Sequence, residues 1–127
     1  MPVRWGEMDA LRHVNNAAYF RFFEEARVRL LLALGLGPGG ARNWVLAHAS
    51  CDFLKPLLYP ADIVVGLKLL RVGRSSAEFD CWVADAKDPA VRHARGRNVL
   101  VCVDSATGQS IPWPDTDRQA LLRFFSV

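Results

Sequence analysis

Apolar residues recur at three- and four-residue steps after Asn15 and Asn16, a period typical of an amphipathic helix. The recurring positions are Tyr19, Phe20, Phe23, Ala26, Leu30, Leu31 and Leu34. Asn15 or Asn16 is expected to cap this helix, because an Asn side chain accepts a hydrogen bond from an unpaired backbone N–H. Gly35 and the Gly-Pro-rich residues 37–40 are expected to end it. The sequence therefore predicts one long helix.

The rest of the chain has the shorter period of β-strands. The candidate strands cover residues 44–54, 63–70, 77–84 and 92–104, with turn residues between them. A short apolar segment at 3–5 is counted as a fifth strand. Asp115 or Thr116 is expected to cap a short terminal helix. The pattern predicts an α+β fold in which a five-stranded antiparallel sheet wraps around one long central helix.

The bulk composition is that of a folded globular protein. The chain has 127 residues, of which 51% are hydrophobic and 23% are charged, and this suits a single domain over 1–127. No apolar run reaches the roughly 18 residues that a membrane span needs. The first residues lack the basic and then apolar pattern of a signal peptide. We therefore expect a cytoplasmic protein without a membrane partner.

The cysteines and histidines show no spacing typical of a metal site or of a disulfide framework. These residues are Cys51, Cys81, Cys102, His13, His48 and His93. The cysteines are few, far apart and flanked by apolar residues, so we expect reduced thiols in the core. The net charge of +3 is only mildly basic, and no nucleic-acid motif is present. A phosphate-bearing small molecule fits such a small excess better than nucleic acid.

Residues 4–27, R-W-G-E-M-D-A-L-R-H-V-N-N-A-A-Y-F-R-F-F-E-E-A-R, resemble the hotdog-fold thioesterases of the 4-hydroxybenzoyl-CoA thioesterase type. Their usual pattern is Asp-x-Asp-x-x-Gly-His-Val-Asn-Asn, followed by a helix with Tyr and Glu-x-Ala-Arg. The resemblance extends over most of the chain and implies hydrolysis of an acyl-CoA without a metal or redox cofactor. It also implies a homodimer or homotetramer in which active sites form at the subunit interface.

The resemblance assigns the catalytic carboxylate to Asp9, as nucleophile or as general base on a water. It assigns the amide that polarises the thioester carbonyl to Asn16 or an immediate neighbour. A helix N-terminus suits this role, because its unpaired N–H groups point at the developing oxyanion. His13 is expected to order the loop or, as the second interpretation, to act on the substrate. Tyr19 is a candidate both for packing and for contact with the substrate.

For the CoA end of the substrate, Arg74 with Ser75 and Ser76 forms a turn that could hold phosphate by charge-assisted hydrogen bonds. Solvated surface residues are the alternative interpretation of the same turn. The secondary candidates are Arg71, Arg95 and Arg97. Five aromatic residues are candidates to line an acyl pocket, namely Trp5, Tyr19, Phe23, Trp44 and Phe53.

The motif departs from the family pattern at three positions. Glu7 stands for the first Asp, Arg12 for the usual Gly, and Leu11 where plant acyl-carrier-protein thioesterases have an Asn.

Some hotdog enzymes instead place the catalytic acid on the helix, which would make Glu24 the candidate. The alternative functions are an acyl-carrier-protein thioesterase, an enoyl-thioester hydratase or dehydratase, and a non-catalytic acyl-CoA-binding module. Of these alternatives, only the non-catalytic binding module is favoured by a departure from the motif, because Arg12 in place of Gly would crowd the site.

Overall fold

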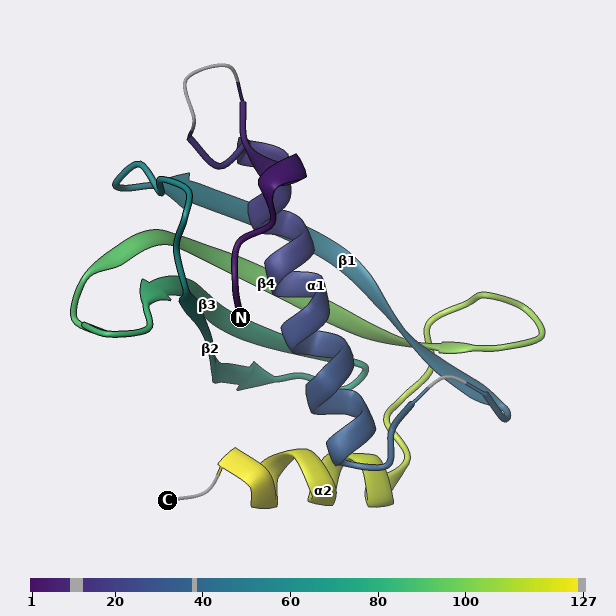
Figure 1. The fold of residues 1–127 in the computed structure, drawn as a ribbon. Helices are drawn as coiled ribbons and strands as arrows, with labels where there is room; N and C mark the ends of the chain where they lie inside the picture. Colours follow the sequence, from purple (N-terminus) through teal and green to yellow (C-terminus); the bar gives the residue numbers. More distant parts are fainter. Residues whose placement is uncertain (10–12, 38, 126–127) are drawn as a thin grey trace.

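In the computed structural model, residues 1–9, 13–37 and 39–125 are described, and they form one antiparallel sheet with helical segments. The strands are β1 (Arg42–Phe53), β2 (Ile63–Val72), β3 (Ser76–Asp85) and β4 (Arg92–Asp104). They lie side by side in the order β1-β4-β3-β2 (Figure 1). The helical segments are the 3-10 turn η1 (Trp5–Glu7), α1 (Asn16–Ala33) and α2 (Asp115–Phe125). The α+β class and the two helices agree with the prediction.

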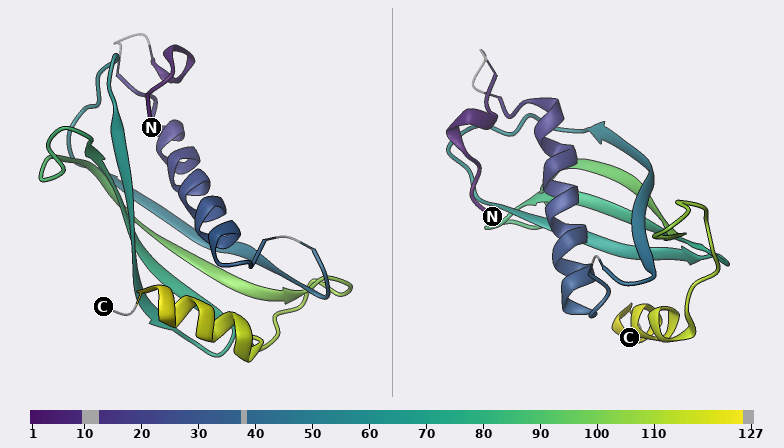
Figure 2. Two further views of the ribbon diagram at one scale, coloured as in Figure 1. Left: turned by 60° about the horizontal axis from the view of Figure 1, so that its bottom comes forward. Right: turned by 90° about the vertical axis from the view of Figure 1, so that its right-hand side faces the viewer.

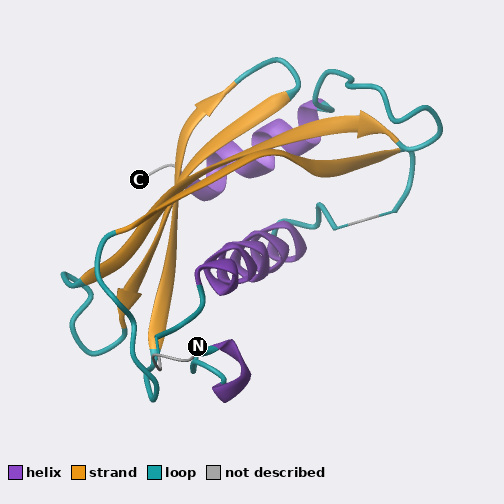
Figure 3. Cartoon of the chain, turned by 90° about the horizontal axis from the view of Figure 1, so that it is seen from above, coloured by secondary structure: helices purple, strands orange, loops and turns teal. Residues whose placement is uncertain are grey.

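Helix α1 lies across one face of the sheet (Figures 2 and 3). The Asn15 side chain caps it by accepting a hydrogen bond from the Ala17 N–H at 2.9 Å. It ends where Gly35 takes a positive φ of 72°, and the Leu36 N–H then bonds back to the Leu31 carbonyl at 2.8 Å. Both helix ends therefore lie where the sequence predicts them.

The buried face of α1 is rotated from the predicted one. Phe20 was expected to be buried but is 39% exposed, whereas Phe22 and Arg27 are buried. Phe23, which both the prediction and the structure place on the buried face, fills the space over Gly96 of β4. A Cβ at Gly96 would lie only 3.1 Å from the Phe23 ring and 2.2 Å from the Ser50 carbonyl oxygen. A glycine is therefore required where α1 and β1 both approach β4 closely.

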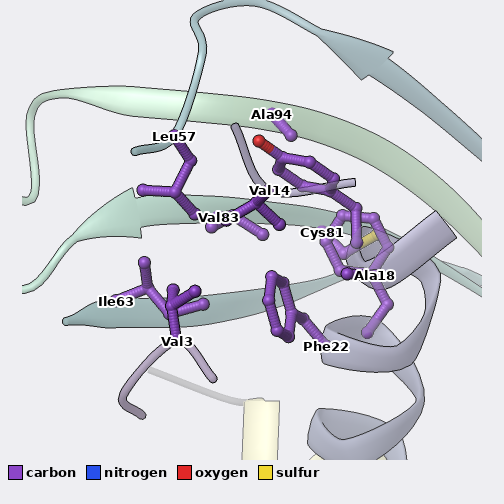
Figure 4. Packing of buried hydrophobic residues seen from close by; sticks show 11 residues of the cluster. Val3, Val14, Ala18, Phe22, Leu57, Ile63, Cys81, Val83 and Ala94 are labelled. Atoms are coloured by element: carbon purple, nitrogen blue, oxygen red, sulfur yellow. The ribbon is translucent and has the colours of Figure 1, made fainter. Parts of the chain in front are cut away.

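The core consists of two apolar clusters along α1, separated by a buried polar pair. Figure 4 shows the first cluster, in which Val14, Phe22, Leu57 and other side chains meet near the start of α1. The second cluster gathers around Leu30, near the end of the helix. Between them, the Arg27 guanidinium donates a hydrogen bond to the side-chain oxygen of Asn98, whose amide contacts Cys81 Sγ at 3.4 Å. Burial lowers the pKa of Arg27.

The prediction of five strands is wrong for the described residues, which contain four. The segment at 3–5 pairs with the chain before β2 only through a single bridge, Pro2 with Asp62. Pro2 has no N–H to extend the ladder. The chain then turns into η1, where the Glu7 carboxylate accepts a hydrogen bond from the Arg4 N–H at 2.7 Å. Pairing with the sheet therefore stops after a few residues.

Helix α2 closes the far end of the same sheet face (Figure 1). The indole of Trp113, just before α2, packs on Trp44 of β1 with ring centroids 3.4 Å apart. The Asp117 carboxylate is buried and accepts hydrogen bonds from Arg42 Nε at 2.6 Å and Trp44 Nε1 at 3.3 Å. This end of the sheet is therefore held by both packing and a buried ion pair.

Candidate active site

A cleft of about 160 Å³ opens where the N-terminal loop enters α1. Its lining consists of Asp9, His13, Val14, Asn16, Tyr19, Phe53, Leu54, Lys55 and Pro56. Four predicted site residues, Asp9, His13, Asn16 and Tyr19, are therefore brought together at one cavity. Its volume is below the roughly 300–1,000 Å³ of a typical small-molecule pocket. Only a small part of a large substrate would fit inside.

The loop before α1 orients Asp9 toward this cleft. The Asp9 N–H donates to the His13 carbonyl at 2.7 Å, and the His13 N–H donates to Asp9 Oδ1 at 3.2 Å. The backbone of His13 also bridges to Leu58, in the segment after β1. Asp9 therefore closes its own loop, as a turn-capping Asp would, while its side chain still lines the cavity. Leu11 and Arg12 lie outside the described residues.

The first turn of α1 lies at the same cleft, since Asn16 is part of its lining. Asn15 accepts hydrogen bonds from the Ala17 N–H with its side chain and from the Ala18 N–H with its carbonyl, both at 2.9 Å. Among the described residues, no hydrogen-bond acceptor is found for the Asn16 N–H. A helix N-terminus carries roughly half a positive charge. An amide at position 16 is thus suited to bind a carbonyl oxygen or an anion.

Tyr19 forms the apolar floor of the cleft. Its side chain is 2% exposed, and its ring packs edge-on against Phe53 with centroids 5.2 Å apart. Burial raises the pKa of the Tyr19 hydroxyl, and a backbone hydrogen bond from Leu57 opposes this shift. The segment after β1 supplies the opposite wall, through Leu54, Lys55 and Pro56. Sequence reasoning missed this wall, since Lys-Pro there signals only the end of a strand.

Arg74, Ser75 and Ser76 do not lie at the cleft. They form the turn between β2 and β3, next to Trp113, whose N–H donates to the Arg74 carbonyl at 3.0 Å. Phe53 at the cleft is in register with Ala94 and, through it, with Val83. Ser76 is seven residues before Val83 on β3, or about 23 Å away at about 3.3 Å per residue. Within one chain, this turn is at the opposite end of the sheet.

Three of the five aromatic pocket candidates also lie elsewhere. Trp5 is 72% exposed in η1, Phe23 is fully buried in the core, and Trp44 packs on Trp113. Only Tyr19 and Phe53 line the cleft. Glu7 is buried and organises the entry loop, because its carbonyl also accepts a hydrogen bond from the Asn15 N–H at 2.6 Å.

Two alternative nucleophiles are not at the cleft. Glu24 is exposed on α1 and is not part of the cleft lining. The cysteines are not part of the lining either: Cys81 and Cys102 lie in the core as predicted, whereas Cys51 is only partly buried. Burial raises the pKa of Cys51 to about 11 and of Cys81 to about 12, so both stay protonated and weakly nucleophilic near neutral pH. The acid available at the cleft is Asp9.

Known proteins share both sequence and fold with this chain. The sequence profile described as the thioesterase-like superfamily matches residues 3–121. The chain belongs to this superfamily. It is similar in structure to the PA2801 protein of Pseudomonas aeruginosa, with a TM-score of 0.88 and 39% identity over 95% of this chain and 94% of that one. It is also similar to a thioesterase from Thermus thermophilus complexed with coenzyme A and Zn, with a TM-score of 0.85 and 29% identity over 98% and 91% of the two chains.

The YsmA protein of Bacillus subtilis is 27% identical over 124 residues, which are 96% of this chain and 82% of that protein. From these matches, the protein is a thioester hydrolase with the hotdog fold. No helix in the described part of the chain is long and apolar enough to cross a membrane.

Proposed function

We propose that this thioesterase hydrolyses acyl-CoA to a free acid and CoA at the cleft between the Asp9 loop and the start of α1. The observation that carries the proposal is that Asp9 and the first amide of α1 line one cavity. The coenzyme A bound to the Thermus thermophilus relative supports the choice of CoA as the thiol carrier.

In this mechanism the thioester carbonyl oxygen accepts a hydrogen bond from the Asn16 N–H. The partial charge of the helix N-terminus stabilises the oxyanion that forms when the carbonyl carbon is attacked. One such donor lowers the barrier by about 3 kcal/mol. The C–S bond then breaks, the sulfur leaves as the CoA thiolate, and it takes up a proton from water.

Asp9 drives the attack, either as the base that removes a proton from an attacking water or as the nucleophile. In the nucleophile route, loss of the thiolate leaves an acyl–Asp9 mixed anhydride, which water then hydrolyses to the free acid and the regenerated Asp9 carboxylate. The hydrogen bond from the His13 N–H to Asp9 Oδ1 keeps the carboxylate turned toward the cleft. We assign His13 the role of ordering this loop, because its backbone is bonded on both sides. Tyr19 and Phe53 provide apolar contacts for the part of the acyl group next to the carbonyl.

The CoA phosphates would be held by Arg74, Ser75 and Ser76 of a second copy. Strand β1 pairs only with β4 in the described chain, and its other edge carries exposed Val45 and Leu46. If two β1 edges pair antiparallel about a two-fold axis, the far end of one sheet lies beside the near end of the other. Such pairing removes the offset of about 23 Å along the strands and places the end of the sheet that carries Arg74 level with the partner's cleft. The active site is then formed by a homodimer or by the dimers of a homotetramer.

The test is release of free thiol from a panel of acyl-CoAs graded in length and aromaticity. We expect Asp9→Asn to lower kcat on the best substrate by about 10³-fold, within the range for general acid–base groups, because Asn cannot attack or take a proton. The fold should survive, because the Asn side-chain oxygen can still accept the His13 N–H. Glu24→Gln serves as the matched control and should retain turnover. Full activity of Asp9→Asn would refute the assignment of Asp9.

A further inference from the structure

We propose that His93 is a positioning residue, which holds the wall of the cleft opposite Asp9 in place. This inference rests on the proposed function. His93 is the second residue of β4 and does not itself line the cleft. It lies behind the Lys55–Pro56 segment, in a separate cavity of about 340 Å³.

His93 is bonded to this segment through both its backbone and its side chain. Its carbonyl accepts hydrogen bonds from the N–H groups of Leu54 at 2.9 Å and Lys55 at 3.1 Å. Its ring Nδ1 lies 3.3 Å from the Lys55 carbonyl oxygen and 3.2 Å from the Pro56 carbonyl oxygen. One residue therefore makes four polar contacts with the three residues that form the wall.

These contacts determine the tautomer of the ring. A carbonyl oxygen can only accept, so Nδ1 must carry the proton and donate to both oxygens. In the neutral ring Nε2 is then an acceptor. It is the one buried side-chain nitrogen or oxygen in the described part of the chain without a hydrogen-bond partner. His93 is 7% exposed, so water reaches little of the ring.

An unpaired buried acceptor such as Nε2 lowers the stability of the fold. If position 93 only had to fill space, a side chain without such an acceptor would fill it equally well. The contacts at Nδ1 indicate what the ring contributes. They hold two carbonyls of a Pro-containing segment that has no regular ladder with β4 beyond Phe53. From the helix side, the Val14 N–H bonds the Leu57 carbonyl at 2.8 Å. The wall is thus fixed from both sides, and the sheet side depends on His93.

The experiment compares His93→Leu, which removes the donor, with His93→Asn, whose side-chain N–H can replace Nδ1–H. We expect His93→Leu to lower kcat on the best acyl-CoA by about 10- to 100-fold, the scale of a 1 Å misplacement of the reacting groups. KM should change less than about threefold, and His93→Asn should stay within about threefold of the wild type in kcat. Leu121→Val, buried at the α2 end, is the control for a general loss of Tm.

Equal kcat losses in His93→Leu and Leu121→Val would overturn the proposal. A kcat of His93→Asn as low as that of His93→Leu would also overturn it. Two measurements remain informative even if His93→Leu does not fold or the wild type hydrolyses no acyl-CoA. Ring ¹⁵N chemical shifts of the wild type should give the Nδ1–H tautomer. An Nε2–H tautomer would contradict the proposed hydrogen bonds from Nδ1 to the Lys55 and Pro56 carbonyls. In His93→Asn, amide exchange at Leu54 and Lys55 should stay as slow as in the wild type. Faster exchange there contradicts the inferred donor role. Loss of wild-type turnover alone would refute only the proposed function.

Discussion

The two ends of the sheet use polar groups in opposite ways. At the α2 end, Asp117 is buried and accepts hydrogen bonds from Arg42 and Trp44, and Trp44 also packs on Trp113. At the cleft end, Asp9 is exposed, and Asn16, the first residue of α1, lines the same cavity. A buried, fully bonded carboxylate contributes to the stability of the fold, whereas an exposed one beside a helix N-terminus remains accessible to a substrate. We therefore propose that the α2 end of the sheet stabilises the fold, whereas the cleft end carries the chemistry.

The strongest test of this division is Asp117→Ala. We expect a loss of about 3 kcal/mol in the free energy of unfolding, because Arg42 is left as an uncompensated, largely buried charge. Chemical denaturation measures it. Asp80→Ala is the control, since its partner Arg95 is exposed on the opposite face, and the loss there should be below about 1 kcal/mol. A large fall in kcat of folded Asp117→Ala would show that the two ends are not independent.

At the cleft end, Asn15→Ala should cost about 1 kcal/mol of stability, because the Ala17 N–H loses its cap. The same change should lower kcat several-fold, since a frayed first turn no longer holds the Asn16 amide in place. Thiol-release kinetics and thermal unfolding measure the two effects. Thr107→Ala, in the exposed turn after β4, removes the acceptor of the Gln109 N–H and should leave kcat unchanged. If Asn15→Ala changes stability alone, the helix start is not part of the chemistry.

Arg74→Ala should raise KM for acyl-CoA about five- to tenfold with little change in kcat, as expected for one lost charge-assisted contact to a phosphate. The corresponding acyl-pantetheine lacks the nucleotide, so its KM should be unaffected. Equal KM changes for both substrates would contradict the assignment of the phosphate site to this turn.

The smallest effect is expected at the thiols. The pKa values of about 11 for Cys51 and about 12 for Cys81 lie above their ordinary range, so the folded protein holds both as thiols at pH 8. Iodoacetamide should therefore modify them slowly until the protein unfolds. Cys51→Ser should keep kcat within about twofold. Rapid alkylation accompanied by loss of turnover would instead indicate a thiol nucleophile.

Local patterns were sufficient for most of the elements. The Asn15 cap, the Gly35 stop and the alternation in β3 depend on neighbours in the chain, and each element begins and ends close to its predicted position. The motif around Asp9 and Asn16 is likewise local, because the two residues are only seven positions apart in the chain and line the same cleft.

Tertiary structure decided what depends on residues distant in the chain. Arg27 is buried because Asn98 of β4 lies opposite it, and the Lys55–Pro56 wall stands where it does because His93 of β4 holds it. Arg74 lies far from Asp9 because the strands between them run the length of the sheet. By itself, the sequence determined both helices and the four strands, since these follow from short-range periodicity and capping, and its local motif indicated the candidate catalytic residues. Only packing between strands and helix decided which of the predicted groups share a site, because that depends on register and on the space left over Gly96.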